Sequence, residues 1–224
     1  DVHSHLIPGI DDGSNTLEES IILIKQLSDL GYKKIITTPH IMVDYFKNNA
    51  DTINSGLATL RNELSKQNIA ISIEAAAEYM FDDGMIKKFK KKELLTFGNN
   101  YVLIELSAYN PPENLIQTFF DLKMDGYTPV LAHPERYPYW HDNIEFYETL
   151  KNHEILFQIN IPSLSGYYSP IVKKICEELI TRNMVEFVGS DTHNLEYITM
   201  LKKACYSPYL ETLINSGKLR NNQL

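Results

Sequence analysis

The sequence is poor in cysteine and has no excess of basic residues, and each shortage excludes a class of protein. Two cysteines, Cys176 and Cys205, occur without a C-x-x-C pair among 224 residues, which excludes a disulfide scaffold and favours a reducing compartment such as the cytoplasm. The 21 Lys and Arg against 29 Asp and Glu give a formal net charge of −8, the wrong sign for a nucleic-acid partner. Long apolar runs and a signal-peptide pattern are also missing, so we expect no membrane insertion.

Apolar residues make up 43% of the chain, enough to form the core of a single domain over residues 1–224. Residues 16–32 have helical apolar spacing, begin with a Thr16/Glu19 capping box and end at Gly31. A short β-branched run at 33–40 follows and predicts a buried strand. The same order recurs, with further helices predicted at 51–67, 84–93, 112–127, 143–153 and 171–183, and strands at 1–5, 69–79, 101–106, 128–137, 155–160 and 184–191.

Seven apolar strands alternating with amphipathic helices predict an α/β fold with a parallel sheet covered by helices. Seven such units in this length suit a closed or nearly closed (β/α)7 barrel better than two small domains. An open, doubly wound sheet is the alternative. In both architectures the functional groups are expected at the carboxyl ends of the strands.

Ligand-type side chains stand at the ends of six of these seven predicted strands. Five of the seven histidines occupy such positions; His141 and His153 do not, and we interpret them as surface or helix-capping residues. A single such residue is more often a hydrogen-bonded strand end, but the ends of parallel strands converge, and mixed imidazole and carboxylate ligands suit zinc, manganese or iron. The candidate ligands are His3, His5, Asp12, His40, Glu78, Glu105, His133, Asp191 and His193, with Asp11 less favoured than Asp12.

A competing motif lies at Cys176 and Arg182, which have the C-x5-R spacing of cysteine-dependent phosphatases. The motif falls inside a predicted helix, has no glycines to form a phosphate loop, and carries Glu177 and Glu178, which would repel an anion. We therefore interpret Cys176 as a buried helical residue.

The strand-end motifs resemble those of the polymerase and histidinol phosphatase (PHP) superfamily. These motifs are H-x-H at the start, T-x-P-H, A-A-E, I-E, A-H-P-E-R-Y and S-D-T-H-N, and they extend from His3 to His193. The set LIEL, AHPERY and GSDTHN, with IDDG close after HSH, is most similar to the CpsB/CapC-type manganese-dependent tyrosine-protein phosphatases of bacterial capsule and exopolysaccharide biosynthesis. The resemblance implies a distorted seven-stranded (β/α)7 barrel with its metal site at the carboxyl ends of the strands.

The resemblance also implies two or three divalent metal ions, with manganese favoured over iron or zinc. Arg136 matches the family's arginine near the phosphate, and the implied catalytic residues are Arg136, Asp191 and His40. The alternative for Arg136 is a surface ion pair with Glu135 or a neighbour. By position, His3, His5, Glu78 and Asp191 would hold one ion, Glu78, Glu105 and His133 a second, and Asp12, His40 and His193 a third.

Three divalent ions (+6) against four carboxylates (−4) leave +2, a positive site that suits a phosphate dianion. Water activated by the ions is the expected nucleophile. The implied function is that of a protein-tyrosine phosphatase, a phosphoric monoester hydrolase, acting on the tyrosine-rich tail of a bacterial polysaccharide-export kinase. A small-molecule phosphoesterase such as a histidinol-phosphate phosphatase and a non-enzymatic metal-binding module are the alternatives. The oligomeric state stays open.

Overall fold

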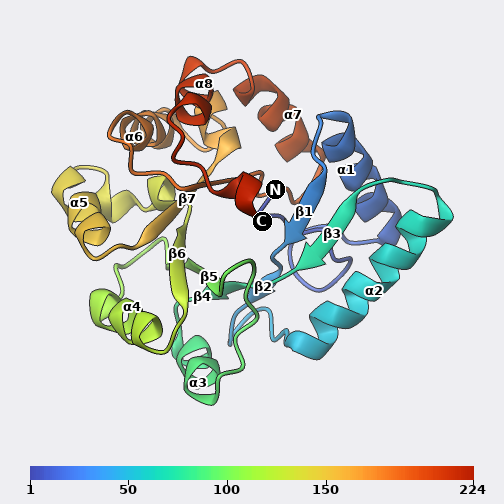
Figure 1. Ribbon diagram of the computed structural model, residues 1–224, viewed down its shortest axis with the longest axis horizontal. Helices are drawn as coiled ribbons and strands as arrows, with labels where there is room; N and C mark the ends of the chain where they lie inside the picture. Colours follow the sequence, from blue (N-terminus) through green and yellow to red (C-terminus); the bar gives the residue numbers. More distant parts are fainter.

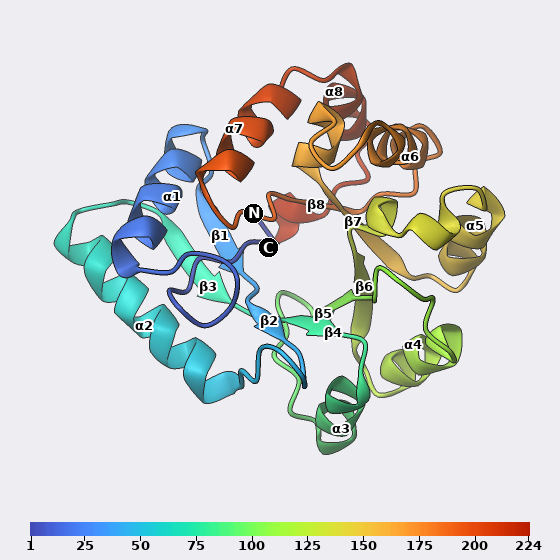
Figure 2. The same cartoon turned by 180° about the vertical axis from the view of Figure 1, so that it is seen from behind.

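Helices surround a curled sheet of parallel strands in the computed structural model, which describes residues 1–224 (Figure 1). Every strand pair is parallel. The first six helices follow one another around the strands in the order of the sequence, and the last helix then lies between the sixth and the seventh, as the views from the front and from behind both show (Figures 1 and 2). The predicted α/β class, with a parallel sheet covered by helices, is therefore confirmed.

Eight short strands and eight α-helices make up this arrangement. The strands are β1 (Lys34–Thr37), β2 (His40–Ile41), β3 (Ser72–Ala75), β4 (Glu78–Met80), β5 (Tyr101–Glu105), β6 (Thr128–Ala132), β7 (Leu156–Asn160) and β8 (Phe187–Gly189). The helices are α1 (Leu17–Asp29), α2 (Ala50–Lys66), α3 (Asp83–Lys91), α4 (Leu115–Met124), α5 (Ile144–Asn152), α6 (Pro170–Thr181), α7 (Leu195–Ala204) and α8 (Pro208–Asn215). Short 3-10 helices are η1 (Pro134–Arg136), η2 (Pro138–Trp140), η3 (Ile161–Ser165) and η4 (Asn221–Gln223).

The prediction of seven strands in one barrel was wrong in its strand count. Six strands form one sheet in the order β2-β4-β5-β6-β7-β8, and β1 and β3 form a separate pair. The predicted strands 33–40 and 69–79 are each divided in two, at Thr38–Pro39 and at Ala76–Ala77. Pro39 has no N–H to donate to a ladder, which accounts for the interruption beside it. Backbone bonds still cross the gap, from Ala76 N to Thr37 O (2.9 Å) and from Glu78 N to Pro39 O (3.1 Å).

The predicted first strand, residues 1–5, forms no regular ladder. Its single bridge pairs Ser4 with Thr192 in parallel. Backbone hydrogen bonds nevertheless bind it on both sides, so this segment is a seam between β1 and the residues that follow β8. The bonds are Ile36 N to Asp1 O (2.9 Å), Thr38 N to Ser4 O (2.7 Å), Asp191 N to His3 O (2.8 Å) and His5 N to Thr192 O (3.0 Å).

The predicted helices are confirmed, with boundaries that shift by a few residues. At the start of α1 the Thr16 hydroxyl accepts a bond from Glu19 N, while the Glu19 carboxylate accepts from Asn15 N rather than from Thr16. Gly31, which follows the helix, has a φ of +99°, a conformation that glycine adopts without strain. Helices α7 and α8 were not predicted.

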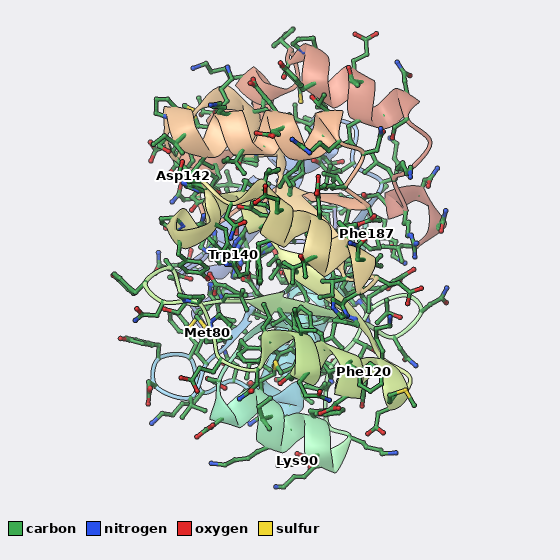
Figure 3. All side chains as sticks on the ribbon, turned by 90° about the vertical axis from the view of Figure 1, so that its left-hand side faces the viewer. Met80, Lys90, Phe120, Trp140, Asp142 and Phe187 are labelled. Carbon is green, nitrogen blue, oxygen red and sulfur yellow. The ribbon has the colours of Figure 1, made fainter.

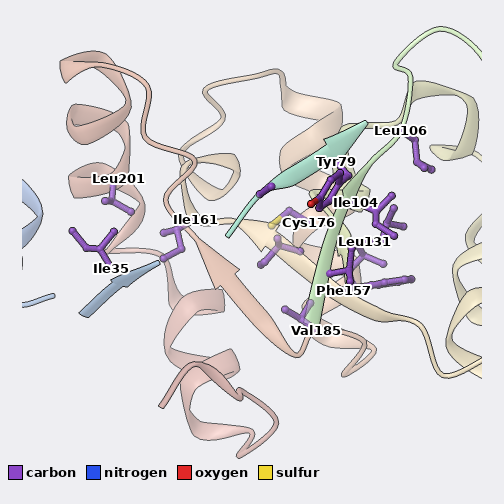
Figure 4. Close-up of a cluster of buried hydrophobic side chains, with 14 of the residues drawn as sticks. Ile35, Tyr79, Ile104, Leu106, Leu131, Phe157, Ile161, Cys176, Val185 and Leu201 are labelled. Atoms are coloured by element: carbon purple, nitrogen blue, oxygen red, sulfur yellow. The ribbon is translucent and has the colours of Figure 1, made fainter. Parts of the chain in front are cut away.

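Both faces of the central strands are buried, as expected for a parallel sheet covered by helices. Along β5, Val102 and Ile104 join the main hydrophobic cluster beneath the helices, whereas Leu103 joins a smaller cluster together with Val130 of β6. Part of the main cluster is drawn in Figure 4, where the labelled Cys176 belongs to α6. This two-sided burial is why the strands are apolar at consecutive positions.

The two ends of the strands lie on opposite sides of the molecule. In Figure 3, Met80 at the carboxyl end of β4 and Asp142 beyond β6 lie on one side, and Phe187 at the start of β8 lies on the other. Both cysteines are free thiols, as expected from their number. None of the helices combines the length and apolar character that a membrane span requires.

Candidate metal centre

All nine predicted ligand residues meet at the carboxyl side of the sheet. They come from the seam segment, the loop before α1, the first residues of β2 and β4, the end of β5, the turn that follows β6 and the segment after β8. Two of them, His133 and Asp191, have positive φ values of +32° and +50°, so the chain turns sharply where it leaves β6 and β8. The groups whose ligand atoms all lie within 4.8 Å of one another are His5/Asp12/His40/His193, His3/Glu78/His133, His3/His5/Asp191 and His40/Glu78/Glu105.

The centre of the cluster is formed by four side chains. The Nε2 atoms of His3 and His5 lie 3.3 Å apart. Glu78 Oε2 lies 3.1 Å from the first and 3.4 Å from the second, and Asp191 Oδ1 lies 3.3 and 3.5 Å from them. All four side chains are buried. These residues are the set expected to hold one ion, and their ligand atoms face one another.

The other two expected ion sites overlap with this centre. Glu78 Oε1 lies 3.1 Å from His133 Nε2, and Glu105 Oε1 lies 3.6 Å from the same nitrogen. On the opposite side, Asp12 Oδ1 lies 3.4 Å from His193 Nε2 and 3.5 Å from His40 Nε2. Glu78 belongs to more than one group, which fits the expectation that it bridges two ions. The assignment of particular residues to particular ions stays a prediction.

Three of the histidines are oriented by a hydrogen bond from the ring nitrogen that points away from the cluster. His3 Nδ1 donates to Gln158 Oε1 (2.6 Å), and His193 Nδ1 donates to the backbone oxygen of Asp191 (2.8 Å). His5 Nδ1 donates to Asp11 Oδ2 (2.8 Å). An acceptor at Nδ1 selects the tautomer in which Nε2 keeps its lone pair, as metal-ligating histidines require.

Asp11 therefore has a supporting role, and the preference for Asp12 as the ligand agrees with the geometry. Asp11 Oδ2 accepts from His5 Nδ1 and from His40 N (3.1 Å), while its Oδ1 accepts from Gly13 N (3.0 Å). Although burial raises the pKa of this carboxyl, the charge of His5 and these hydrogen bonds lower it to about 2. The Asp11 carboxylate thus fixes one ligand ring and two backbone segments at once.

The donor set fits divalent cations because several buried polar atoms of the candidate ligands lack a hydrogen-bond partner. They are His40 Nδ1, His133 Nδ1, Glu78 Oε2 and Glu105 Oε2. Such unsatisfied groups are rare in native proteins and call for a partner such as an ion. Burial and the nearby Glu78 charge also raise the pKa of Glu105 well above its usual value. A cation at this position would relieve the repulsion between the two carboxylates.

Arg136 lies beside the cluster and pairs with a buried carboxylate. Its Nη1 donates to Asp191 Oδ2 (3.2 Å), and its guanidinium carbon lies 4.4 Å from the ring centre of Tyr168. Of the alternative ion pairs for Arg136, the one with Glu135 is not formed, because the Glu135 carboxylate is buried and accepts from Asn160 N (2.9 Å) and Ser163 Oγ (2.7 Å) instead. A third of the Arg136 side chain stays exposed, so its guanidinium is open to a ligand.

Two further side chains were not predicted and hold the outer oxygen of Asp191. Asn160 Nδ2 donates to Asp191 Oδ2 at 2.6 Å, and the Tyr168 hydroxyl donates to the same oxygen at 3.1 Å. Asn160, like Gln158, is a polar residue in the otherwise apolar strand β7, and this interruption of the pattern was the available signal. The position of Tyr168, in the loop before α6, carries no such signal.

The remaining candidates lie away from the cluster. His141 Nε2 donates to the backbone oxygen of Glu135 (2.9 Å), and His153 is the residue that ends α5. Cys176 is fully buried in α6, and burial raises the pKa of its thiol well above the usual value. The predictions for these residues are confirmed, and the C-x5-R spacing has no role in this site.

The cluster opens into a cavity of about 610 Å³ on the surface. This volume lies within the range of ligand pockets. Candidate ligands form one part of its wall, together with Arg136. Its other lining residues are Met42, Asp44, Tyr45, Met80, Asp82, Leu106, Ser107, Ala108, Tyr109, Asn194 and Tyr197.

Comparison with known proteins agrees with this arrangement. The family model of capsular polysaccharide synthesis, CpsB/CapC, matches residues 1–211. The chain belongs to this family. The tyrosine-protein phosphatase CpsB of Streptococcus agalactiae serotype V is 30% identical to it over 230 residues, which cover 100% of this chain and 93% of that protein.

Solved structures are similar over nearly the whole chain. The crystal structures of YwqE from Bacillus subtilis and CpsB from Streptococcus pneumoniae, described as metal-dependent tyrosine phosphatases, include a chain that is 29% identical with a TM-score of 0.88; the match covers 97% of this chain and 88% of that one. Histidinol phosphate phosphatase from Lactococcus lactis is 17% identical with a TM-score of 0.55, each chain being covered to 91%. That more distant likeness shows a shared fold.

Proposed function

We propose that residues 1–224 act as one metallophosphatase domain that hydrolyses phosphotyrosine in a protein substrate. The observation that carries the proposal is the convergence of nine ligand-type side chains, several with unpartnered buried atoms. Seven of the nine line an open cavity beside Arg136, and His3 and His5 are buried behind them. Relatives of this chain in the CpsB/CapC family are named tyrosine-protein phosphatases, which supports phosphotyrosine as the substrate.

In this proposal the cluster holds two or three divalent ions, with manganese favoured over iron or zinc. When bound, the ions polarise the phosphoryl oxygens and activate water for attack. The ligands would be His3, His5, Asp12, His40, Glu78, Glu105, His133, Asp191 and His193. Gln158, Asp11 and the Asp191 backbone oxygen keep three of these rings in the ligating tautomer.

Arg136 would bind the phosphate in the proposed reaction. A guanidinium presents two N–H donors in a plane and can pair two phosphoryl oxygens at once. Its bond to Asp191 Oδ2 and its contact with Tyr168 fix its orientation at the cavity wall. Asp191 and His40 would serve as ligands that also orient the phosphoryl group, since both line the cavity.

The proposed substrate is a phosphotyrosine protein, and we infer the tyrosine-rich tail of a bacterial polysaccharide-export kinase. Membership of a capsular polysaccharide family supports this choice. The open cavity would admit a chain segment more readily than a site closed around a small metabolite. The two free thiols suit the cytoplasm, where such a tail would be reached.

The test is to assay metal-loaded protein on a phosphotyrosine peptide and on histidinol phosphate side by side. We expect turnover of the peptide to exceed turnover of histidinol phosphate in kcat/KM. Elemental analysis of the same preparation should find at least two metals per chain after loading with manganese. A preference for histidinol phosphate would favour the small-molecule phosphoesterase. Metal binding without turnover of either substrate would favour a non-enzymatic metal-binding module.

A further inference from the structure

The wall of the cavity at the metal centre also includes apolar side chains, which the proposed chemistry does not use. Met42, Met80, Leu106 and Ala108 contribute apolar surface to its wall. In Figure 3, Met80 lies on the side of the molecule that carries the carboxyl ends of the strands. The phosphate of a substrate would occupy the polar part, beside the candidate ligands and Arg136. The group esterified to that phosphate must then lie in the rest of the cavity.

Two strongly exposed tyrosines also line this cavity. Tyr45 is 81% exposed and Tyr109 is 89% exposed; among the large apolar side chains only Tyr206, which lies outside the cavity, is as exposed. They come from different loops, between β2 and α2 and between β5 and α4. Exposed aromatic side chains beside a cavity are typical of binding sites, because a ring offers a large contact area at a low cost in side-chain entropy.

The loop that carries Tyr45 is held in place at several points. Met42 N donates to Phe46 O (2.9 Å), which forms a tight turn with Tyr45 in it. The Phe46 ring stacks on His40, with ring centres 5.5 Å apart and planes 11° from parallel. Val43 N donates to Asp82 Oδ2 (2.9 Å). These contacts fix the turn to a candidate metal ligand and to the start of α3, so the backbone that carries Tyr45 is held in place.

The loop that carries Tyr109 is anchored through Ser107. Tyr109 N donates to Ser107 Oγ (3.2 Å), and the Tyr139 hydroxyl donates to Ser107 O (2.9 Å). At the base of the same loop, Leu106 N donates to the Tyr137 hydroxyl (2.9 Å). Tyr137 and Tyr139 belong to the segment that follows His133. The same segment therefore anchors the Tyr109 loop and carries a candidate metal ligand.

We propose that Tyr45 and Tyr109 form an aryl-recognition rim that contacts the ring of the phosphotyrosine and the adjoining peptide backbone. The inference rests on the proposed phosphatase function and adds the residues that determine specificity for the group esterified to the phosphate. The Met42, Met80, Leu106 and Ala108 surface supplies the apolar wall for the ring, and the two tyrosines contact it at the mouth of the cavity. Aromatic pairs of this kind prefer offset or edge-to-face contacts.

The experiment compares Tyr45→Ala, Tyr109→Ala and the double variant with the wild type, all loaded with manganese. The substrates are a phosphotyrosine peptide and phenyl phosphate, which carries the ring without the peptide. Inorganic phosphate, used as a competitive inhibitor, reports on the polar part of the cavity alone. Tyr206→Ala is the matched control, because Tyr206 is 90% exposed and lies outside this cavity.

We expect each single variant to raise KM for the peptide by about 3- to 10-fold and the double variant by roughly 10- to 100-fold, with kcat nearly unchanged. KM for phenyl phosphate should rise less, and the inhibition constant of inorganic phosphate and the metal content should stay at the wild-type values. Tyr206→Ala should match the wild type. Tyr45→Phe and Tyr109→Phe should keep most of the wild-type KM, because they retain the ring.

An unchanged peptide KM in the double variant would overturn the inference while leaving the phosphatase function intact. An inhibition constant for phosphate that rises as much as the peptide KM would also overturn it, since the effect would then lie in the metal centre. If the metal-loaded wild type fails to hydrolyse the phosphotyrosine peptide, the proposed function itself is wrong, and the aryl-recognition rim is wrong with it.

Discussion

Arg136 donates from Nη1 to Oδ2 of Asp191 at 3.2 Å, while Oδ1 of the same carboxylate faces the ring nitrogens of His3 and His5. One carboxylate therefore joins the candidate metal centre to the cation at its edge. Together with the partial exposure of Arg136, this relationship places its guanidinium where an anion bound at the metal centre can reach it.

Arg136→Lys should lower kcat/KM for a phosphotyrosine peptide by roughly 10- to 1,000-fold, about 1.4 to 4 kcal/mol, with metal content unchanged. A lysine keeps the charge but cannot pair two phosphoryl oxygens in one plane or stack on Tyr168 in the same way. Steady-state kinetics and elemental analysis are the measurements. Arg182→Lys, which alters an exposed arginine paired with Glu148 and Glu178, is the control. Full turnover by Arg136→Lys would assign Arg136 a structural role only.

Asp11→Asn should weaken metal binding by about 10- to 100-fold, although Asp11 is not a predicted ligand. Both carboxylate oxygens accept hydrogen bonds from N–H groups, so an amide would turn its own N–H2 toward one of these donors. Titration of metal-free protein with manganese measures the affinity. Asp44→Asn, a change at an exposed carboxylate of the cavity, should bind the metal as the wild type does. Equal affinities for both variants would show that His5 needs no carboxylate partner.

Cys176→Ser should keep phosphatase activity within a few-fold of the wild type but lower the free energy of unfolding by about 1 to 3 kcal/mol. The thiol is buried in the core of α6, where a hydroxyl would be desolvated without an assured partner. Kinetics and urea unfolding separate the two effects. Cys205→Ser, at an exposed position, should change neither quantity. A loss of activity as large as that of a ligand variant such as His40→Ala would restore a cysteine mechanism.

Glu135→Gln should stabilise the protein at alkaline pH relative to the wild type. Burial raises the pKa of Glu135 from its ordinary value near 4.5 to about 7, against the opposing hydrogen bonds from Ser163 and Asn160. Because the folded pKa is the higher one, the stability of the wild type is fully present below the unfolded pKa and is lost as the pH rises through the folded pKa. Glutamine does not titrate, so the free energy of unfolding of Glu135→Gln should exceed that of the wild type by an amount that grows with pH to about 3 kcal/mol at most.

Urea unfolding of both proteins at about pH 5 and about pH 8, at a fixed metal concentration, measures this difference. Taking the difference between the two proteins removes the titration of the metal ligands, which both share. Glu148→Gln, which removes a carboxylate of an exposed ion pair, serves as the control for the loss of a surface charge. A Glu135→Gln advantage that is the same at both pH values would contradict the raised pKa.

The convergence of the candidate ligands could be predicted from the sequence because most of them stand where an apolar run ends. His133 follows β6 directly and Asp191 comes two residues after β8, and parallel strands bring their carboxyl ends to one side. The partners of these ligands were harder to predict, because Gln158 lies 155 residues from His3 in the chain. Contacts of that sequence separation depend on the tertiary fold and leave no local pattern.

The strand count failed for a local reason. The strand predicted over residues 33–40 is interrupted at Thr38–Pro39, and the chain resumes pairing at His40, which lies opposite Glu78 in a different sheet. A sequence pattern shows that a ladder of hydrogen bonds is interrupted. It does not show whether the chain beyond the interruption pairs with the same strand as before or with a strand of another sheet. Helices α7 and α8 were not predicted, although Asn194 caps α7 through its side chain.

The seam between the first residues and the segment after β8 gives the metal centre a topological role. His3 and His5 come from one end of the chain and Asp191 from near the other, so an ion held by all three would close a loop of almost the entire polypeptide. Closing so long a loop is entropically costly and comes late in folding. Removal of the ions should therefore loosen the seam before the helices melt, so that hydrogen exchange at His5 N and Asp191 N would report metal loss ahead of any change in helix content.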